Sequence, residues 1–510
     1  MKTKYILMAV LATMALPMAA QETYENTNMV DNDLNGTARY VGMGGAMDAL
    51  GADISTISTN PAGIGLFRSG YVGGSFGFVS QDGVKDFANG NKTTMSFDQI
   101  GLVYAMRNGR NSFLNVAFNY HKSRNFNQIL SAADRLDNAS QNKLTYQKLA
   151  NGVFKTSDDA TYNQLDHLYL NNLLYNKEDD KYYNYPATGY TFNRATKGYI
   201  GEYDLNISGN IHDRVYLGVT VGLHDVHYKH YSEYAENFAS NPDGITGLTV
   251  GDSREITGSG VDIKAGVIFR PVESSPFRIG ISVASPTFYD LTTRNYTTMT
   301  DGAVTKSVNE GYDFKLYTPW KFGLSLGHTV GNYLALGASY EYADYGSMDT
   351  RINEDGYYDG WYGTYYESSS SDANMNKHTE QTLKGVSTLK LGLEYKPVPE
   401  VALRVGYNYV SPMYNENGFK DGSVWSAGSY YASQTDYTNW KSTNRFTLGA
   451  GYNVGRLSFD VAYQYSAKNG DFYPFMSYVD SQDTAENNIA DAVKVNDKHH
   501  QVLFTIGYKF

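Results

Sequence analysis

Cysteine is absent from this chain of 510 residues. Its absence excludes disulfides, thiolate chemistry and a lipid anchor on an N-terminal cysteine. Beyond residue 20 the sequence also lacks any run of about 18 or more apolar residues, so we expect no transmembrane helix. The rest of the chain is therefore either soluble or a membrane-spanning β-barrel.

Positive charge is scarce as well. The chain has 42 Lys and Arg residues against 53 Asp and Glu residues, and its net charge is −11. This balance disfavours nucleic acids and anionic surfaces as partners.

The first 20 residues have the pattern of an export signal. Lys2 and Lys4 are followed by an apolar stretch over residues 5–16 and by Ala19-Ala20. The apolar stretch is too short to span a hydrocarbon core of about 30 Å. We therefore expect residues 1–20 to be a signal peptide that is cleaved during export.

What the sequence has in quantity is tyrosine and glycine, with 46 and 50 residues, while 41% of the residues are hydrophobic. Porin-like barrels have such compositions because each strand faces lipid only at alternate residues and aromatic girdles lie at both interfaces. Two-residue alternation is clearest where Leu217, Val219, Val221 and Leu223 oppose Tyr216, Gly218, Thr220, Gly222 and His224.

This alternation predicts an all-β fold, a transmembrane antiparallel barrel of about fourteen strands. The expected strands are 69–80, 95–107, 112–124, 197–210, 214–230, 257–271, 277–291, 312–330, 333–346, 382–396, 400–413, 441–453, 456–468 and 498–510. Short connections follow the even-numbered strands and long ones follow the odd-numbered strands. Short periplasmic turns and long extracellular loops are typical of bacterial outer-membrane barrels, in which both termini lie inside.

The few prolines agree with this arrangement, because proline removes a hydrogen bond from a strand. Four prolines fall in or beside short turns, and we expect three more to lie near the outer rim. The turn prolines are Pro271, Pro276, Pro397 and Pro399; the rim prolines are Pro286, Pro319 and Pro412.

The C-terminal residues Tyr508 and Phe510 end a strand that alternates through its last residue. A terminal phenylalanine with an aromatic residue two positions before it resembles the signal by which the barrel-assembly machinery recognises its substrates. The alternative is an ordinary last strand of a soluble sandwich.

Two long loops have their own patterns. The longest, 125–196, is expected to hold two helices that either form an apolar docking groove or pack on each other as a lid. The first pattern comprises Ile129, Leu130, Ala133 and Leu136; the second comprises Leu165, Leu168, Tyr169 and Leu173, with possible caps Ser157 and Asp158. The loop 347–381 is rich in tyrosine, and it either contacts glycans, lipid headgroups or apolar ligands or is an ordinary solvated loop.

No group of residues predicts catalysis. His224, His227 and His230 are three apart, so on a strand His227 faces away and the outer two are separated by about 20 Å. His499 and His500 also face opposite sides, and no spacing resembles a zinc or haem-attachment motif. We therefore predict no catalytic residue, metal or cofactor, and we do not expect an enzyme.

The most specific pattern precedes the first strand. A small-residue segment, 36–46, contains Gly44 and Gly45, and it is followed by Asn60-Pro61-Ala62-Gly63. In this position the pattern resembles the N-terminal hatch of the FadL/TodX outer-membrane transport family. The resemblance assigns Asn60, Pro61 and Ala62 to the hatch structure, with Gly44, Gly45 and Gly63 permitting its path and gating.

The resemblance implies residues 21–68 as lead and hatch inside a barrel of residues 69–510, in the outer membrane of a Gram-negative cell. It implies passive uptake of hydrophobic small molecules such as long-chain fatty acids or aromatic compounds. It also implies contact with outer-membrane lipid and lipopolysaccharide, and a lateral exit beside a kinked third strand. The alternative is a FadL-like barrel that serves as a membrane partner in protein secretion or surface attachment.

Two features depart from the family pattern. The third expected strand, 112–124, contains neither proline nor glycine, so no kink is visible in its sequence. The long loop with helical patterns follows this third strand, whereas the prominent helical loops of the characterised fatty-acid transporters lie later.

Overall fold

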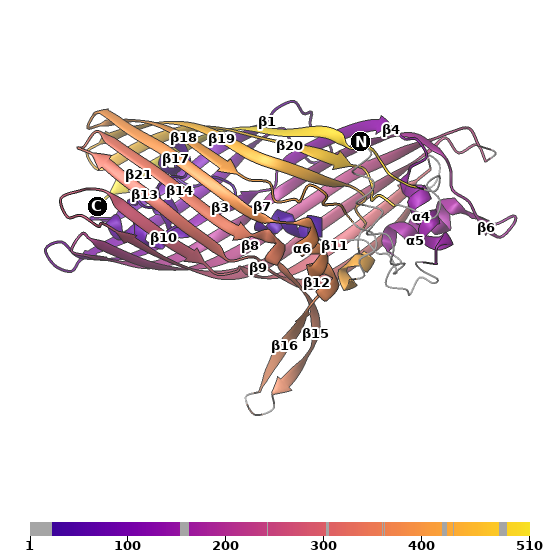
Figure 1. The fold of residues 1–510 in the computed structure, drawn as a ribbon, viewed down its shortest axis with the longest axis horizontal. Coiled ribbons are helices and arrows are strands. Elements are labelled where there is room, and N and C mark those ends of the chain that lie inside the picture. The colour runs from indigo at the N-terminus through magenta and orange to yellow at the C-terminus, as the bar shows by residue number, and fades with distance from the viewer. Residues whose placement is uncertain are drawn as a thin grey trace.

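The computed structural model describes residues 23–152, 163–241, 243–301, 305–359, 361, 363–420, 426–431, 433–478 and 487–510. These residues form a closed antiparallel barrel of fourteen strands, elongated along its axis (Figure 1). Closure comes from the first and last strands, which pair from Tyr71↔Lys509 to Gln81↔His499.

Each expected strand segment is present in the wall, although several are longer than expected or consist of two pieces. In order around the barrel, the wall strands are β1 (Tyr71–Gln81), β2 (Thr93–Arg107), β3 (Phe113–Asn125) continued by β4 (Gln128–Arg135), β7 (Ala187–Ile211), β8 (Val215–Phe238), β9 (Gly247–Phe269), β10 (Arg278–Ala284) continued by β11 (Phe288–Thr300), β12 (Thr305–Tyr317) continued by β13 (Lys321–Val330), β14 (Leu334–Asp344) continued by β15 (Asp349–Asp359), β17 (Gly385–Val398), β18 (Val401–Val410), β19 (Tyr437–Val454), β20 (Leu457–Tyr473) and β21 (Val493–Lys509). The strand β16 (Thr364–Ser371) pairs with β15 in a hairpin.

The other elements lie in the N-terminal segment and in the long connections. They are α2 (Thr23–Val30), α3 (Ala38–Gly42), η1 (Ile54–Ser58), η2 (Pro61–Leu66), α4 (Gln141–Ala150), α5 (Gln164–Tyr169), η3 (Leu170–Leu174), β5 (Tyr175–Asn176), β6 (Lys181–Tyr182), η4 (Tyr345–Ser347), α6 (Ala373–Thr382) and η5 (Ala427–Tyr431). Among the described residues, no helix is both long enough and apolar enough to span a bilayer.

The barrel has the reverse polarity of a soluble protein. On β8 the outward residues Val219 and Leu223 are 50% and 49% exposed, whereas the inward Thr220 is fully buried. The same alternation places Leu391 outside and Glu394 inside on β17. An apolar exterior around a polar interior is stable only where lipid surrounds the exterior, so this is the surface of a membrane-spanning barrel.

Two prolines do not lie where the sequence analysis put them. Pro286 separates β10 from β11 and Pro319 separates β12 from β13, so both interrupt strands that continue for 13 residues beyond them. The rim prediction was wrong for this pair because the strands extend further than their alternation indicates. Proline breaks the ladder locally, and the adjacent pieces β11 and β12 pair again beyond it.

The first helical pattern in the long loop was also wrong. Residues 128–135 form the strand β4, which pairs with β7 from Gln128↔Thr196 to Arg135↔Gly189. A short apolar run fits both periodicities, and pairing with the long neighbouring strand decides between them.

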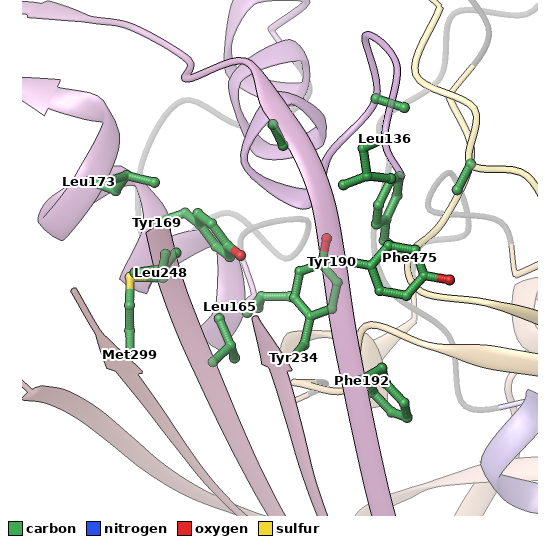
Figure 2. Close-up of a cluster of buried hydrophobic side chains, with 14 of the residues drawn as sticks. Leu136, Leu165, Tyr169, Leu173, Tyr190, Phe192, Tyr234, Leu248, Met299 and Phe475 are labelled. Carbon is green, nitrogen blue, oxygen red and sulfur yellow. The ribbon is translucent and has the colours of Figure 1, made fainter. Parts of the chain in front are cut away.

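The second helical pattern is confirmed by α5 and η3. Asn163 caps α5 by accepting a hydrogen bond from the Asp166 amide, while the expected caps Ser157 and Asp158 lie outside the described residues. The helix α4 was not expected. Leu165, Tyr169 and Leu173 are buried in one cluster with strand side chains that include Tyr190 and Tyr234 (Figure 2), so this helical stretch packs on the barrel strands.

The loop 347–381 is more ordered than the sequence indicates. It contains the hairpin of β15 and β16, which projects away from the barrel (Figure 1), and η4 and α6 lie at its two ends. Trp361 at the tip is 89% exposed.

Candidate functional site

The N-terminal segment, residues 23–67, lies inside the barrel. Asn60, Pro61 and Ala62 are buried, and the Asn60 side chain accepts a hydrogen bond from the Ala62 amide at 3.2 Å. Pro61 occupies the first position of η2, where its fixed φ suits a helix start. The motif faces β8, because a Cβ on Gly218 would lie 2.4 Å from the Pro61 carbonyl oxygen.

Gly44 and Gly45 have φ values of +62° and +78°, in the left-handed region that favours glycine. A Cβ on Gly44 would also lie 2.8 Å from the Tyr407 amide nitrogen. Gly63 is required for a different reason, since a Cβ there would lie 2.4 Å from Thr56 Oγ1. These three glycines therefore allow a tight backbone path.

The wall offers glycines where the N-terminal backbone approaches it. A Cβ on Gly337 would lie 1.9 Å from the Ala46 carbonyl oxygen, and one on Gly392 would lie 2.3 Å from the Met43 carbonyl oxygen. The wall glycines whose Cβ would lie within 3.1 Å of residues 43–61 are Gly101, Gly218, Gly266, Gly280, Gly327, Gly337, Gly392 and Gly406, and we call them the glycine belt. Glycines inside strands often mark such close backbone approaches.

Ion pairs hold the segment at the end of the barrel with short turns. Arg39 forms a two-point contact with Glu394, at 3.0 and 3.2 Å, and Arg404 joins the same carboxylate at 2.7 Å. Lys390 lies 3.7 Å from Asp48. Burial raises the pKa of the neighbouring Tyr40 to about 12.

The helix α2 lies at the opposite end, among the long connections. Tyr24 stacks on Tyr414 with ring centroids 5.1 Å apart, and its hydroxyl donates to Asn439 at 2.8 Å. The Thr23 hydroxyl lies 3.1 Å from His378 Nδ1 in α6. The described N-terminal segment thus runs through the lumen from the end with long connections to the end with short turns.

The wall is incomplete between β2 and β3. Their ladder ends at Gln99↔His121, although β2 extends back to Thr93 and β3 extends on to Asn125. Across the unpaired stretch, Lys122 Nζ donates to Ser96 Oγ at 2.6 Å. The third strand therefore leaves its neighbour, which its lack of proline and glycine did not reveal.

Residues of the N-terminal segment cover the free edge of β3. The Asp33 amide donates to the Ser123 carbonyl at 2.9 Å, and the Asn125 amide donates to the Asp33 carboxylate at 2.8 Å. Asn35 Nδ2 bridges the two strands, donating to the Lys122 carbonyl and to Asp98 Oδ1 at 3.0 Å each.

Asp31 lies beside this cover. Burial raises the pKa of the Asp31 carboxyl, but the charges of Arg124, Arg445 and Lys468 outweigh burial and leave the pKa below its usual value of 3.8. The Arg124 guanidinium is 2.8 Å from the Asp31 carboxylate.

An internal cavity lies behind the unpaired stretch, with Asp98 of β2 and Arg124 of β3 in its lining. Its apolar and aromatic lining residues include Tyr24, Leu34, Phe126, Tyr228, Met413, Tyr414, Tyr437 and Trp440. Its charged lining residues include Asp31, Asp33, Asp98, Arg124, Arg194, Asp436, Arg445, Lys468 and Asp497. The cavity is therefore amphipathic.

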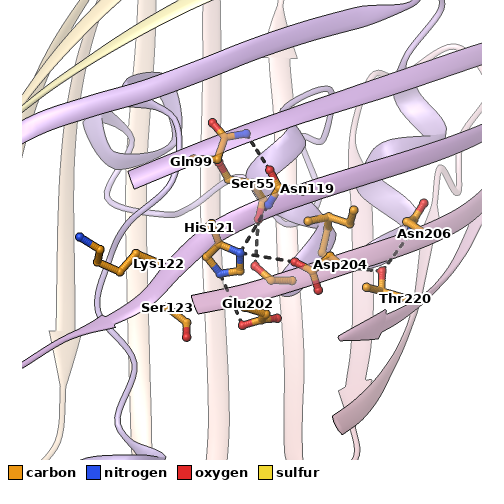
Figure 3. Close-up of polar contacts among 12 residues, drawn as sticks. Ser55, Gln99, Asn119, His121, Lys122, Ser123, Glu202, Asp204, Asn206 and Thr220 are labelled. Atoms are coloured by element: carbon orange, nitrogen blue, oxygen red, sulfur yellow. Dashed lines mark hydrogen bonds and ion pairs between the residues drawn. The ribbon is translucent and has the colours of Figure 1, made fainter. Parts of the chain in front are cut away.

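The histidines of β8 lie as their spacing predicts, with His224 and His230 buried inside and His227 outside. His224 nevertheless shares Glu202 with His121, in two overlapping groups of ionisable residues on separate strands that sequence spacing cannot reveal. Figure 3 shows His121 between Glu202 and Asp204. A second internal cavity borders this group.

Sequence reasoning missed Asp33 and Asn35, which carry no recognisable motif. It also missed the anchors Lys390 and Glu394, although a signal was available, since both alternate with the outward Leu389, Leu391 and Leu393. Tyr508 faces outward at the short-turn end, and the Phe510 amide donates to the Gly70 carbonyl at 3.0 Å. Their role as an assembly signal remains a prediction.

No protein-family model and no curated relative matches the chain. Among solved structures, the chain is similar to a Pseudomonas aeruginosa FadL homologue, with 12% identity, a TM-score of 0.52 and coverage of 94% of this chain and 100% of that chain. The Ralstonia pickettii toluene transporter TbuX matches with 13% identity, a TM-score of 0.45 and coverage of 93% and 98%. The Pseudomonas putida toluene transporter TodX matches with 11% identity, a TM-score of 0.45 and coverage of 94% and 99%. The FadL-like fold expected from the sequence is therefore confirmed by the first of these likenesses.

Proposed function

We propose that this chain is a passive outer-membrane transporter for hydrophobic small molecules, such as long-chain fatty acids or aromatic compounds, and that it performs no covalent chemistry. The FadL-like fold and the lipid-compatible exterior support a barrel of this kind. Its ligand would enter from the outer leaflet with its lipopolysaccharide, and the barrel-assembly machinery would insert the chain after cleavage of residues 1–20.

The observation that carries the proposal is the unpaired stretch between β2 and β3 with an amphipathic cavity behind it. An apolar solute gains nothing from a water-filled pore, because its favourable surroundings are apolar side chains or lipid. A gap in the ladder is a route by which such a solute leaves the cavity sideways into the bilayer.

The cavity lining refines the substrate class. Aromatic residues such as Tyr414 and Trp440 suit an apolar body, whereas charged residues such as Arg124 suit a polar group. We therefore expect amphipathic compounds to be carried better than pure hydrocarbons of similar size.

The N-terminal segment is proposed to be the hatch. Asp33 and Asn35 hold the free edge of β3 by a few hydrogen bonds, which a ligand in the adjoining cavity could replace. Asn60, Pro61 and Ala62 would hold one part of the segment against the glycine belt, and Gly44, Gly45 and Gly63 would allow the tight backbone path of that same part. Residues 31–35 would be the part that moves, so gating would reside there.

A reversible crosslink tests this route, because the chain has no cysteine of its own. Asn35→Cys and Asp98→Cys, joined by a short reducible bis-thiol reagent, would fix the cover over the gap. We expect uptake of a fluorescent fatty acid into proteoliposomes to stop on crosslinking and to return on reduction.

The control joins Ser80→Cys and Thr93→Cys, whose native hydroxyls are 2.8 Å apart within the intact ladder of β1 and β2. This crosslink should leave uptake unchanged. Undiminished uptake through the barrel crosslinked between residues 35 and 98 would contradict the proposed exit.

The projecting hairpin is the observation that supports the alternative of a protein-docking barrel. Replacing residues 353–369 by a two-residue turn should leave the barrel folded and its uptake intact if transport is the function. Docking would be favoured instead by two results together. The native barrel would capture a secreted protein stoichiometrically and the variant would not, and neither barrel would show measurable uptake.

A further inference from the structure

Four neighbouring wall strands direct ionisable side chains to one place inside the barrel. The register pairs His121 of β3 with Glu202 of β7, and Glu202 with His224 of β8. Asp204 of β7 and the β9 residues Asp262 and Lys264 complete the group, and all of these side chains are buried. We call the six residues the lumenal cluster: His121, Glu202, Asp204, His224, Asp262 and Lys264.

One carboxylate oxygen is shared by both imidazoles. Glu202 Oε2 lies 3.5 Å from His121 Nε2 and 4.0 Å from His224 Nδ1. Two ligands on a tetrahedral Zn²⁺ with bonds of about 2.0–2.2 Å are roughly 3.4 Å apart. Glu202 thus joins two groups of candidate ligands, His121–Glu202–Asp204 and Glu202–His224–Asp262, and within each group the ligand atoms lie within 4.8 Å of one another.

The far side of each imidazole faces a further carboxylate. His121 Nδ1 lies 3.4 Å from Asp204 Oδ2, with the Asn119 amide also 3.4 Å away, and His224 Nε2 lies 3.1 Å from Asp262 Oδ2. Histidines that bind metals usually donate their other ring N–H to a carboxylate or carbonyl, which fixes the ring and its tautomer. Both histidines have such a partner (Figure 3 shows the one at His121).

The charges of the cluster do not balance without an added cation. Glu202, Asp204 and Asp262 are three carboxylates, and Lys264 supplies one ammonium, which contacts Glu202 Oε1 and donates to Asp262 Oδ1 at 2.8 Å. Two negative charges remain in a buried site if both imidazoles are neutral. Either one divalent cation or two imidazole protons can compensate them.

The cluster also has room and access. A Cβ on Gly222 would lie 2.5 Å from Asp262 Oδ1 and 2.8 Å from Lys264 Nζ, so any larger residue would displace the group. His121, Glu202 and His224 line the second internal cavity, through which a hydrated ion can arrive.

We propose that the lumenal cluster is a binding site for a first-row divalent transition-metal cation, which draws the imidazoles of His121 and His224 together on the shared Glu202 Oε2 while Asp204 and Asp262 orient them. Two imidazole nitrogens favour Zn²⁺ and its neighbours over Ca²⁺ or Mg²⁺, which prefer oxygen. Lys264 holds the second oxygen of Glu202 and leaves Oε2 for the ion. The Tyr289 hydroxyl, 3.5 Å from His224 Nδ1, lies beside the site.

The test is metal binding by the purified, metal-free barrel in detergent. Zn²⁺ is titrated in competition with a chromophoric chelator, and Co²⁺ is added separately to record the visible absorption of a bound ion. We expect one equivalent per barrel and proton release on binding, because the ligands must be deprotonated. Glu202→Gln and the double variant His121→Gln with His224→Gln should each weaken binding at least tenfold, and Asp204→Asn should weaken it about 10- to 100-fold.

His227→Gln is the matched control, since His227 lies on the outer face of the same strand and pairs with the exposed Asp225. It should bind as the native chain does. Heat-modifiable electrophoretic mobility verifies that each variant is folded. Equal Zn²⁺ binding by the native chain and the double histidine variant would overturn the site, as would absence of a Co²⁺ spectrum from the native chain. Binding of Ca²⁺ as tight as that of Zn²⁺ would overturn the metal class.

Discussion

Asn60 stabilises its own turn through one side-chain oxygen. This oxygen accepts from the Ala62 amide at the start of η2, and Pro61 needs no hydrogen-bond partner at that position. The motif is therefore a helix start whose carbonyl groups are free to meet the wall. Asn206 Nδ2, for example, lies 3.4 Å from the Pro61 carbonyl oxygen.

Loss of that cap should loosen η2 without unfolding the barrel. Asn60→Ala removes the acceptor, and we expect a loss of about 0.5–2 kcal/mol in the local stability of residues 61–66. Hydrogen exchange of these amides should accelerate, by about fivefold for 1 kcal/mol. Asn60→Ser retains an acceptor and serves as the control; equal acceleration in both variants would contradict the capping role.

Asp31 makes the cover over β3 sensitive to acid. Its pKa in the folded protein is below 3.8, so its attraction to Arg124 is fully present above that value and is lost as the pH falls through the lower, folded pKa. A spin label at the exposed Asn32, introduced as Asn32→Cys, should therefore become more mobile below about pH 4.

The matched variant for this experiment is Asp31→Asn, which carries no titrating group at this position. In that variant the label should already be mobile at pH 7 and should change little with acid. A label at Ser80, on the intact wall, should not respond. Equal acid sensitivity with and without the Asp31 carboxylate would contradict the assignment.

At the scale of elements, the glycine belt explains how a chain segment fits inside a closed barrel. Neighbouring strands such as β14, β17 and β18 lack side chains where residues 43–46 pass. Backbone carbonyls there approach the wall more closely than any Cβ would permit. Fourteen strands form a lumen wide enough to require filling, and this segment fills part of it.

Adding a methyl group to the belt should displace the segment. Gly337→Ala would place a Cβ 1.9 Å from the Ala46 carbonyl oxygen, and overpacking of this kind costs about 1–3 kcal/mol. We expect higher ion conductance in planar bilayers. Gly209→Ala, which would meet nothing within 4 Å, is the control and should conduct as the native chain does. Unchanged conductance of the Gly337 variant would show that the segment tolerates the shift.

At the scale of the whole molecule, the alternation of outward apolar and inward polar residues decides that the outer surface of the barrel requires lipid around it. Val219 lies within the outward apolar row of β8 and is 50% exposed. Val219→Lys should destabilise the barrel in lipid by roughly 2–4 kcal/mol, because the ammonium would face hydrocarbon.

Folding of this variant into vesicles under urea, followed by electrophoretic mobility, measures the effect. His227→Lys is the matched control, because His227 is also outward on β8 but lies beside the charged Asp225, beyond the apolar row. It should fold like the native chain. Equal loss in both variants would argue against a lipid boundary between these positions.

The sequence by itself determined the fold class and the strand number. These follow from local regularities: a period of two along each strand and a turn at its end. The Asn60-Pro61-Ala62 turn could be predicted for the same reason, since its hydrogen bond joins residues that are two positions apart.

Only the tertiary structure decided the β2–β3 gap, the cover by Asp33 and Asn35, the strand β4 and the lumenal cluster. Each depends on residues from different parts of the chain that barrel closure brings together, such as His121 and His224 around Glu202. Periodicity predicts which face of the barrel a residue occupies, but it does not predict which residues of other strands lie at the same height along the barrel axis. That height is set by register and by the packing of the N-terminal segment, which are properties of the closed barrel.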